Sequence, residues 1–440
     1  MSDQLPASSS SAAALPEASV PQIPLGRVFA WAMYDWANSA YSTLLITVVL
    51  HYVQEIVLPD RCGPAAFAWG IGAAMLVAAV LSPLVGAAAD ANRSKRRWLA
   101  GTALSGAAAA VGMAAAPTDQ PGLVLAAFVV MGVCFELSLV PYNGFLPEIT
   151  TEATINRVSA FGFALGYLGG AIPLALAWLI VDRGRHFLWL NDADLDRLGI
   201  LLLGAWWGVF SLPALWVLRD RRPPPERRAT WSETWRTAAG QVGSTLIHVR
   251  RFPQLMLFLV GFLFYNDGIQ TVITQSNTLA SKELHFSIDE LFALVLAIQL
   301  VALPGSLLVG WLSDRVGQKP VLLGCLVIWT GLPLTALVVH GKTAFWMLGL
   351  ALALVLGGTQ SVGRAIMGVL TPRRREAEFF GFFNVSGKAA SVLGAMQFGA
   401  IMVATGNARW AAVSLLVFFL IGGAMVWRVD LAAGRRQADR

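Results

Sequence analysis

Five ionisable residues interrupt long apolar segments of this sequence: Asp35, Glu136, Asp267, Arg364 and Lys388. A charge at the centre of a membrane-spanning helix costs about 2.5–3.5 kcal/mol even on a lenient insertion scale. Such side chains pair with one another or face a water-filled cavity, where they bind solutes or relay protons. The sequence therefore predicts polar chemistry at the centre of an apolar protein.

Amide and hydroxyl side chains recur at helical spacing around these charges. Residues three, four or seven positions apart share one face of a helix, so each of the five segments has one polar face. Amides donate and accept hydrogen bonds, which suits zwitterions and polyols, and an amino acid would also use one acid and one base. The further candidates for substrate binding or coupling are Asn38, Tyr41, Asn143, Asn266, Gln270, Thr274, Gln360 and Asn384.

A structural interpretation of the same charges stays open. Asp35 or Asp267 would then pair with Arg364 and fix helix packing without touching a solute, and Tyr41 would only pack. Three acids face two bases, so one carboxyl should lack a full partner, and desolvation favours the neutral form of such a group. A carboxyl that takes a proton when buried and releases it when wet couples transport to a proton gradient. Glu136 is the first candidate for this role, with a structural glutamate as the alternative.

The composition identifies a membrane protein. Of 440 residues, 56% are hydrophobic and 13% are charged, whereas soluble domains carry about 25% charged residues. About 20 apolar residues span a bilayer as a helix, and we expect twelve such helices. The segments are 28–53, 65–89, 98–118, 121–146, 158–181, 198–218, 253–280, 291–313, 320–339, 343–370, 378–404 and 410–427.

The distribution of lysine and arginine predicts the topology. With the N-terminus in the cytoplasm, the cytoplasmic loops receive most of the 32 basic residues, as the positive-inside rule requires. The expected organisation is a disordered cytoplasmic tail (1–26), a six-helix bundle (27–218), a basic cytoplasmic linker (219–251), a second six-helix bundle (252–428) and a cytoplasmic tail (429–440). A bacterial inner membrane is the expected location.

The two bundles repeat a short motif. "GAAADANRSKRR" begins at Gly86 and follows the second apolar segment, and "GWLSDRVGQK" begins at Gly310 and follows the eighth. Asp35 and Asp267 likewise occupy similar places in the first and seventh segments. A repeat of six plus six helices with a substrate site between the halves is an architecture of secondary transporters.

The second motif resembles the loop motif of the major facilitator superfamily. The resemblance implies an all-α fold of two six-helix bundles related by a pseudo-two-fold axis, with helices 1, 4, 7 and 10 lining a central cavity. Gly310 would let two helices approach, and Asp314 with Arg315 would meet a neighbouring helix N-terminus and latch one face closed. Gly86 and Asp90 match the pattern in the first copy, where Ala91 replaces the usual basic residue.

A narrower resemblance covers residues 34 to about 395. The runs "YDWANSAY", "YNGFLPEI", "FGFALGYLGGA", "FYNDGIQTV", "GGTQSVGR" and "EFFGFFN" resemble the vacuole-effluxer-like family of autophagy-related amino-acid effluxers and their bacterial relatives. Membership implies secondary transport, and fungal relatives are associated with the release of amino acids from the vacuole. A sugar, drug or metabolite exporter of the same superfamily is the alternative.

Other classes of protein are less compatible with the sequence. It has no HExxH helix, GxSxG elbow or P-loop, which argues against an intramembrane enzyme and an ATP-driven pump, and a non-transporting receptor is the remaining alternative. The three cysteines are far apart and predict neither a disulfide framework nor a zinc site. We expect no cofactor, no metal and no nucleic-acid partner. The expected partners are the bilayer, a small solute and protons, and a monomer suffices.

Overall fold

The computed structural model describes residues 24–60, 62–187, 190–221, 229–282, 284–335, 337 and 341–439. These residues are helical almost throughout. Nearly all of the tail expected at 1–26 lies outside the described residues, as does the middle of the linker.

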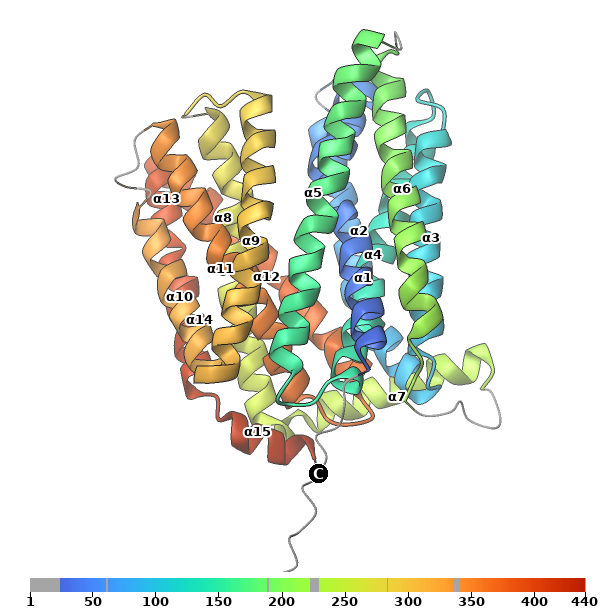
Figure 1. Ribbon diagram of the computed structural model, residues 1–440, viewed down its shortest axis with the longest axis vertical. Helices are drawn as coiled ribbons and strands as arrows, with labels where there is room; N and C mark the ends of the chain where they lie inside the picture. The colour runs from blue at the N-terminus through green and yellow to red at the C-terminus, as the bar shows by residue number, and fades with distance from the viewer. Residues whose placement is uncertain are drawn as a thin grey trace, which may run out of the picture.

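The helices form two bundles side by side (Figure 1). The first contains α1 Leu25–Leu44 with its π-helical continuations Leu45–Val49 and Tyr52–Val57, α2 Cys62–Ala91, α3 Lys95–Ala115, α4 Pro121–Ile149, α5 Ile155–Phe187 and α6 Asp192–Val217. The second contains α8 Pro253–Lys282, α9 Ile288–Val316, α10 Gln318–Thr335, α11 Lys342–Leu370, α12 Glu376–Thr405, α13 Ala408–Ser414 and α14 Leu416–Arg428. Two shorter helices, α7 Trp231–Ile247 and α15 Leu431–Ala438, lie outside the bundles.

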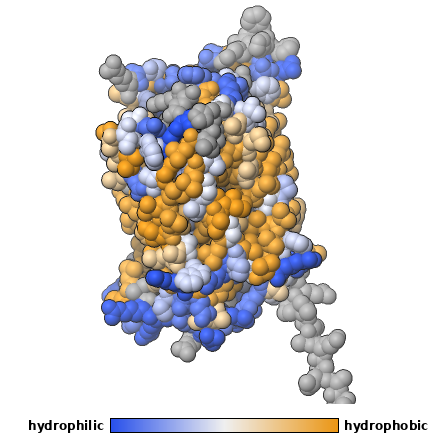
Figure 2. Space-filling view, turned by 90° about the vertical axis from the view of Figure 1, so that its left-hand side faces the viewer, coloured by the Kyte–Doolittle hydropathy of each residue, from blue (hydrophilic) through white to orange (hydrophobic). Residues whose placement is uncertain are grey.

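The helix count agrees with the twelve expected spans. Within the described residues, eleven helical stretches are long and apolar enough to cross a membrane. The α10 helix takes the remaining place, between α9 and α11, and α13 with α14 forms the last span. Figure 2 shows an apolar belt around the middle of the molecule with hydrophilic bands at both ends, as expected of an integral membrane protein.

Local sequence explains several helix ends. Pro121 begins α4, where its missing N–H costs nothing, and Ser287 caps α9 in a capping box with Glu290. Gly406 follows α12 with a φ of 63°, a conformation that favours glycine. The prolines inside α2, α4, α5, α6 and α9 are tolerated because neighbouring helices satisfy the freed backbone groups.

Each bundle has its own large hydrophobic core, and the most extensive contacts between the bundles are made by two pairs of helices. The α5 helix packs along α9, and α2 packs along α12. Small residues permit both contacts, because a Cβ at Gly310 would overlap Ala160 and a Cβ at Gly86 would overlap the backbone of Ala377. These two contact lines are called the α5–α9 seam and the α2–α12 seam.

The α7 helix lies across one end of the molecule, where α15 also lies (Figure 1). This end is called the linker end. Thr230 and Glu233 form a capping box at the start of α7, so the predicted basic linker contains an ordered helix. The "TWSE" run carries the S/T-x-x-E signature of a helix start, but the surrounding arginines and prolines suggested only a solvated linker.

Candidate functional site

Arg364 joins the two bundles. It belongs to α11 of the second bundle, but its Nη1 donates to Asp35 Oδ2 of α1 at 3.0 Å. The same Nη1 reaches Asn143 Oδ1 of α4 at 3.4 Å. Asp35 therefore pairs with Arg364, which was one of the structural pairs anticipated from the sequence.

Arg364 makes two further hydrogen bonds to the first bundle. Its Nε donates to Ser159 Oγ at 3.0 Å, and its Nη2 donates to the Ser159 carbonyl at 2.8 Å. The guanidinium lies 4.7 Å from the ring centre of Trp31 and 4.2 Å from that of Phe163, within cation–π range. Arg364 is only 4% exposed, so the guanidinium is desolvated, and four hydrogen bonds hold it to the first bundle.

A second ion pair also joins the two bundles. Lys388 of α12 places Nζ 2.8 Å from Glu136 Oε1 of α4. One turn earlier, Asn384 Nδ2 donates to Ser82 Oγ at 3.1 Å and to the Glu136 carbonyl at 3.2 Å. Glu136 Oε2 has no hydrogen-bond partner among the described residues, and the Lys388 side chain is 27% exposed. This pair is thus incompletely coordinated.

The acid that lacks a cation is Asp267. It is fully buried, and within the described chain its bonds come from the Gly394 N–H at 2.8 Å and from Thr271 Oγ1 at 3.5 Å. The expectation that one of three acids lacks a base agrees with this geometry. Among the described residues Lys388 of α12 pairs with Glu136, the first candidate for proton coupling, and no basic side chain forms an ion pair with Asp267. Which of these acids binds a proton stays a prediction.

The other predicted polar residues differ in their surroundings. Asn266 donates from Nδ2 to the Gly387 carbonyl at 3.1 Å. Asn38 is buried, with Nδ2 unpaired within the described part of the chain. Tyr41 stacks on Phe135 inside the first core, with ring centres 4.0 Å apart. The side chains of Gln270 and Gln360 are half-buried, and that of Thr274 is exposed and bonds its own helix.

The predicted contact of Asp314 with a helix N-terminus is present on the α5–α9 seam. At the start of α5, Asn156 Nδ2 donates to Asp314 Oδ1 at 3.1 Å, and Arg157 forms an ion pair with Oδ2. Arg315 does not take part in this contact. It lies over the Trp311 ring of its own helix at 4.2 Å, and the cation comes from Arg157 instead.

The first motif makes the matching contact on the α2–α12 seam. Asp90 Oδ2 accepts the Glu378 N–H in the first turn of α12 at 2.8 Å. The basic residue absent at Ala91 is supplied by Lys95, whose Nζ lies 3.1 Å from Asp90, 2.7 Å from Glu148 and 3.0 Å from Glu376. Lys95 is 3% exposed, so one buried cation holds three acids from both bundles.

The α7 helix bridges the bundles at the linker end, which the sequence did not predict. Thr234 accepts from Asn92 Nδ2 of the first bundle at 2.9 Å. On the next turns, Gln241 and Thr245 both donate to the buried Glu378 of α12. Apolar packing holds the same face, because Ala238 is buried against Ala87 and Ala88 and the Trp235 ring lies edge-on to that of Trp98.

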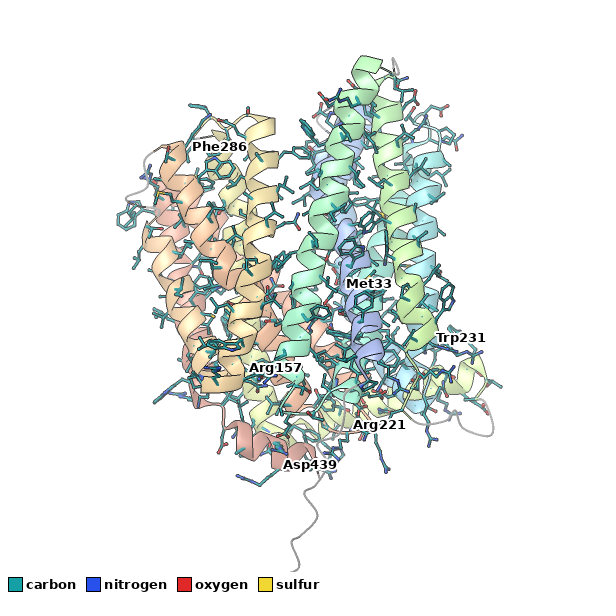
Figure 3. The ribbon with its side chains drawn as sticks, in the orientation of Figure 1. Met33, Arg157, Arg221, Trp231, Phe286 and Asp439 are labelled. Atoms are coloured by element: carbon teal, nitrogen blue, oxygen red, sulfur yellow. The ribbon has the colours of Figure 1, made fainter. Side chains whose placement is uncertain are left out.

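A cavity of about 1140 Å³ lies between the bundles at the linker end. Both acids and bases line it, among them Lys95, Glu148 and Glu376. Figure 3 shows Arg157, Arg221 and Asp439 at this end, whereas Phe286 lies at the opposite end. At that opposite end, the His51–Asp196 and Lys342–Glu290 contacts each stay within one bundle. The polar ties between bundles thus concentrate at the centre and at the linker end.

Known proteins resemble this chain in sequence and in fold. The family model "Vacuole effluxer Atg22 like" matches residues 66–439. The uncharacterized MFS-type transporter YxiO of Bacillus subtilis is 29% identical, with 89% of this chain and 92% of that protein covered. Autophagy-related protein 22 of Kluyveromyces lactis is 25% identical, with 68% of this chain and 64% of that protein covered.

Solved structures share the fold at lower identity. The proton:xylose symporter XylE, a major facilitator superfamily protein, superposes with a TM-score of 0.73 at 13% identity, covering 92% of this chain and 95% of that one. This likeness establishes the major facilitator fold and carries no information about the solute.

Proposed function

Because the chain belongs to the vacuole effluxer Atg22-like family and is a membrane transporter of the MFS type, we propose that it exports an amino acid or a similar small polar metabolite by alternating access. The linker end would face the cytoplasm of a bacterial cell, as the basic loops favour. One observation carries the proposal: two acids and two bases meet as ion pairs between the bundles, where a transporter of this fold binds its solute.

The Lys388–Glu136 pair is the better candidate for direct contact with the solute. A zwitterion supplies a carboxylate that can replace Glu136 on Lys388 and an ammonium group that can bind the unpaired Glu136 Oε2. Such an exchange keeps every buried charge compensated, which an uncharged solute cannot do. The Asp35–Arg364 pair is less suited to this exchange, because four hydrogen bonds already tie Arg364 to the first bundle and its side chain is only 4% exposed.

Alternation would require the linker end to open. The Asp90 and Asp314 contacts each join a motif loop of one bundle to a helix N-terminus of the other, so both must break when the bundles rock apart. Hydrogen bonds and ion pairs suit this role, because water can replace them when the end opens.

The proposal is tested by counterflow in proteoliposomes that contain the full-length protein. Labelled amino acids and labelled sugars are compared side by side. We expect amino-acid exchange in the wild type and its loss in both Glu136→Gln and Lys388→Met, with the variants still monodisperse after purification. Exchange of a sugar but no amino acid would reject the solute class, and the absence of any exchange would reject transport of these solutes.

A pH gradient imposed on the same vesicles tests proton coupling. If Glu136 is the coupling site, Glu136→Gln abolishes uphill accumulation, and persistence of accumulation excludes it. Asp35→Asn and Asp267→Asn are each expected to lose transport while the protein still inserts and folds. Normal flux in both would leave these residues with structural roles only.

A further inference from the structure

Asn266 and Asp267, adjacent on α8, each hold a backbone group of α12. Asn266 Nδ2 binds the Gly387 carbonyl at 3.1 Å, and Asp267 Oδ2 accepts the Gly394 N–H at 2.8 Å. The two contacts are called the α8–α12 clamp. Gly394 is required for it, because a Cβ there would overlap Thr271 Oγ1 and would lie 2.7 Å from Asp267 Oδ1.

The clamp holds the part of α12 that crosses to the other bundle. Lys388 directly follows Gly387 and pairs with Glu136, and Asn384 lies one turn before it on Ser82 and the Glu136 carbonyl. Within the described residues, these are the hydrogen bonds and the ion pair that join this segment of α12 to α4 and α2. A shift of α12 away from α8 therefore moves them.

The internal repeat explains why Asp267 has no cation while Asp35 has one. Arg364 lies six residues before the end of α11, and Asn143 lies six residues before the end of α4, which has the same length of 29 residues. The position of Arg364, which is the cation that pairs with Asp35, thus corresponds to the amide Asn143 in the first bundle. Asp267 is left to backbone and hydroxyl donors.

The other helices packed on α8 bring no free charge to Asp267 within the described residues. Lys388 of α12 and Arg364 of α11 are bound to acids of the first bundle, and α14 has no ionisable residue before Arg428. The remaining described ionisable side chains on α8 and on the elements against it are Tyr265, Lys319, Cys325, Lys342, Glu376, Glu378, Arg409, Arg435 and Arg436, with Arg250 and Arg251 on the turn before α8. Lys319 binds the Val429 carbonyl and Arg409 the Leu337 carbonyl, while Lys342 pairs with Glu290, Glu376 with Lys95 and Glu378 with Arg375.

We propose that Asp267 is a proton-binding site whose occupancy sets the α8–α12 clamp, and so the position of Lys388. A buried carboxylate without a cation loses its hydration free energy, and the free energy gained from two hydrogen bonds is smaller than that loss. The closed clamp consequently holds the neutral carboxyl. When the proton leaves to water, the carboxylate gains by hydration, which separates α8 from α12 and weakens the Lys388–Glu136 contact.

This proposal rests on the transport function proposed above, but its test needs no solute. Full-length protein in vesicles is stepped from acidic to alkaline buffer while the infrared C=O band of protonated carboxyl groups is recorded. Wild type, Glu136→Gln and the exposed-loop control Asp119→Asn are expected to lose a band on this step. Asp267→Asn is expected to lack that change, and an unaltered change in Asp267→Asn would overturn the assignment.

The mechanical part is tested by spin-label distances across the linker end. Labels are placed at Ala153→Cys in the first bundle and Arg436→Cys on α15, with the three native cysteines replaced. We expect the wild-type distance distribution to shift with pH and that of Asp267→Asn to stay closed at every pH. Gly394→Ala, which wedges the clamp apart, should stay shifted toward the open distance.

A pH-dependent shift that survives in Asp267→Asn would disprove the link to α12. Failure of solute counterflow would leave both readouts unchanged, so the proton site and the transport function stand or fall separately.

Discussion

The two seams between the bundles differ in where their polar contacts are most deeply buried. Beside the α5–α9 seam the Asp35–Arg364 pair is buried, and at the linker end Asp314 is held by the buried Asn156 and by Arg157, whose side chain is 69% exposed. Beside the α2–α12 seam the Lys388–Glu136 pair is partly exposed, whereas Lys95 and Glu378 at the linker end are buried and have several partners. Each seam thus has one buried polar contact and one that is partly exposed, and the two lie at opposite places along the seams.

This difference indicates which contacts change during a transport cycle. A buried pair with several further hydrogen bonds is costly to separate, whereas a pair with an unpaired oxygen and a partly exposed ammonium group can exchange partners at lower cost. The Asp35–Arg364 pair is therefore suited to act as the pivot of the interface. The α12 side, with its incomplete pair and the α8–α12 clamp, is suited to be the part that responds to solute and protons.

Replacing Arg364 with leucine should give the largest effect. The change leaves Asp35 buried without its cation, and breaking a buried pair costs about 3–5 kcal/mol. We expect a large fall in the thermal unfolding temperature in detergent and no transport. The double variant Asp35→Asn/Arg364→Leu removes both charges and should recover most of the stability but not the transport. If the double variant is as unstable as the single one, the pair is not the pivot.

Replacing Lys95 with methionine should give the second largest effect. Asp90, Glu148 and Glu376 would lose their shared cation and repel one another, so we expect the linker end to favour the open state. Spin labels at Ala153 and Arg436 would report longer distances than in the wild type. Arg96→Met is the matched control, because Arg96 is the exposed neighbour of Lys95. Equal distances in the two variants would show that the α2–α12 seam is not held by Lys95.

The sequence predicted the architecture well because apolar length and charge distribution decide it. The spans follow from apolar length and the two bundles from the internal repeat, while the Asp314 contact follows from the resemblance of the second motif to the loop motif of the major facilitator superfamily. The pairing of charges was less predictable. Helical spacing places Glu136 and Asp267 on polar faces, but which face meets Lys388 depends on how α4 and α12 are rotated against each other, and no local pattern records that rotation.

Other parts of the site were missed for a related reason. Lys95 stood in a basic run that the positive-inside rule already explained, so nothing marked it as buried. Ser159 lies in a segment without an unusual pattern, and Glu378 begins the "EFFGFFN" run, which served only for the family resemblance; yet Ser159 binds Arg364 and Glu378 joins α7 to α12. Their roles arise only when elements more than a hundred residues apart meet.

The smallest effect is expected at the exposed contact of the α5–α9 seam. Arg157→Ala removes an ion pair whose cation is mostly in water, and such pairs contribute about 0–1 kcal/mol. Added salt should weaken this contact in the wild type, so the stability difference between wild type and variant should shrink as salt is raised. Asn156 continues to bind Asp314 in the variant, which should keep the linker end closed and the transport rate within a few-fold of wild type. An unfolding temperature as low as that of Lys95→Met would mean that both seams are equally strong at the linker end, and the contrast between them would then be wrong.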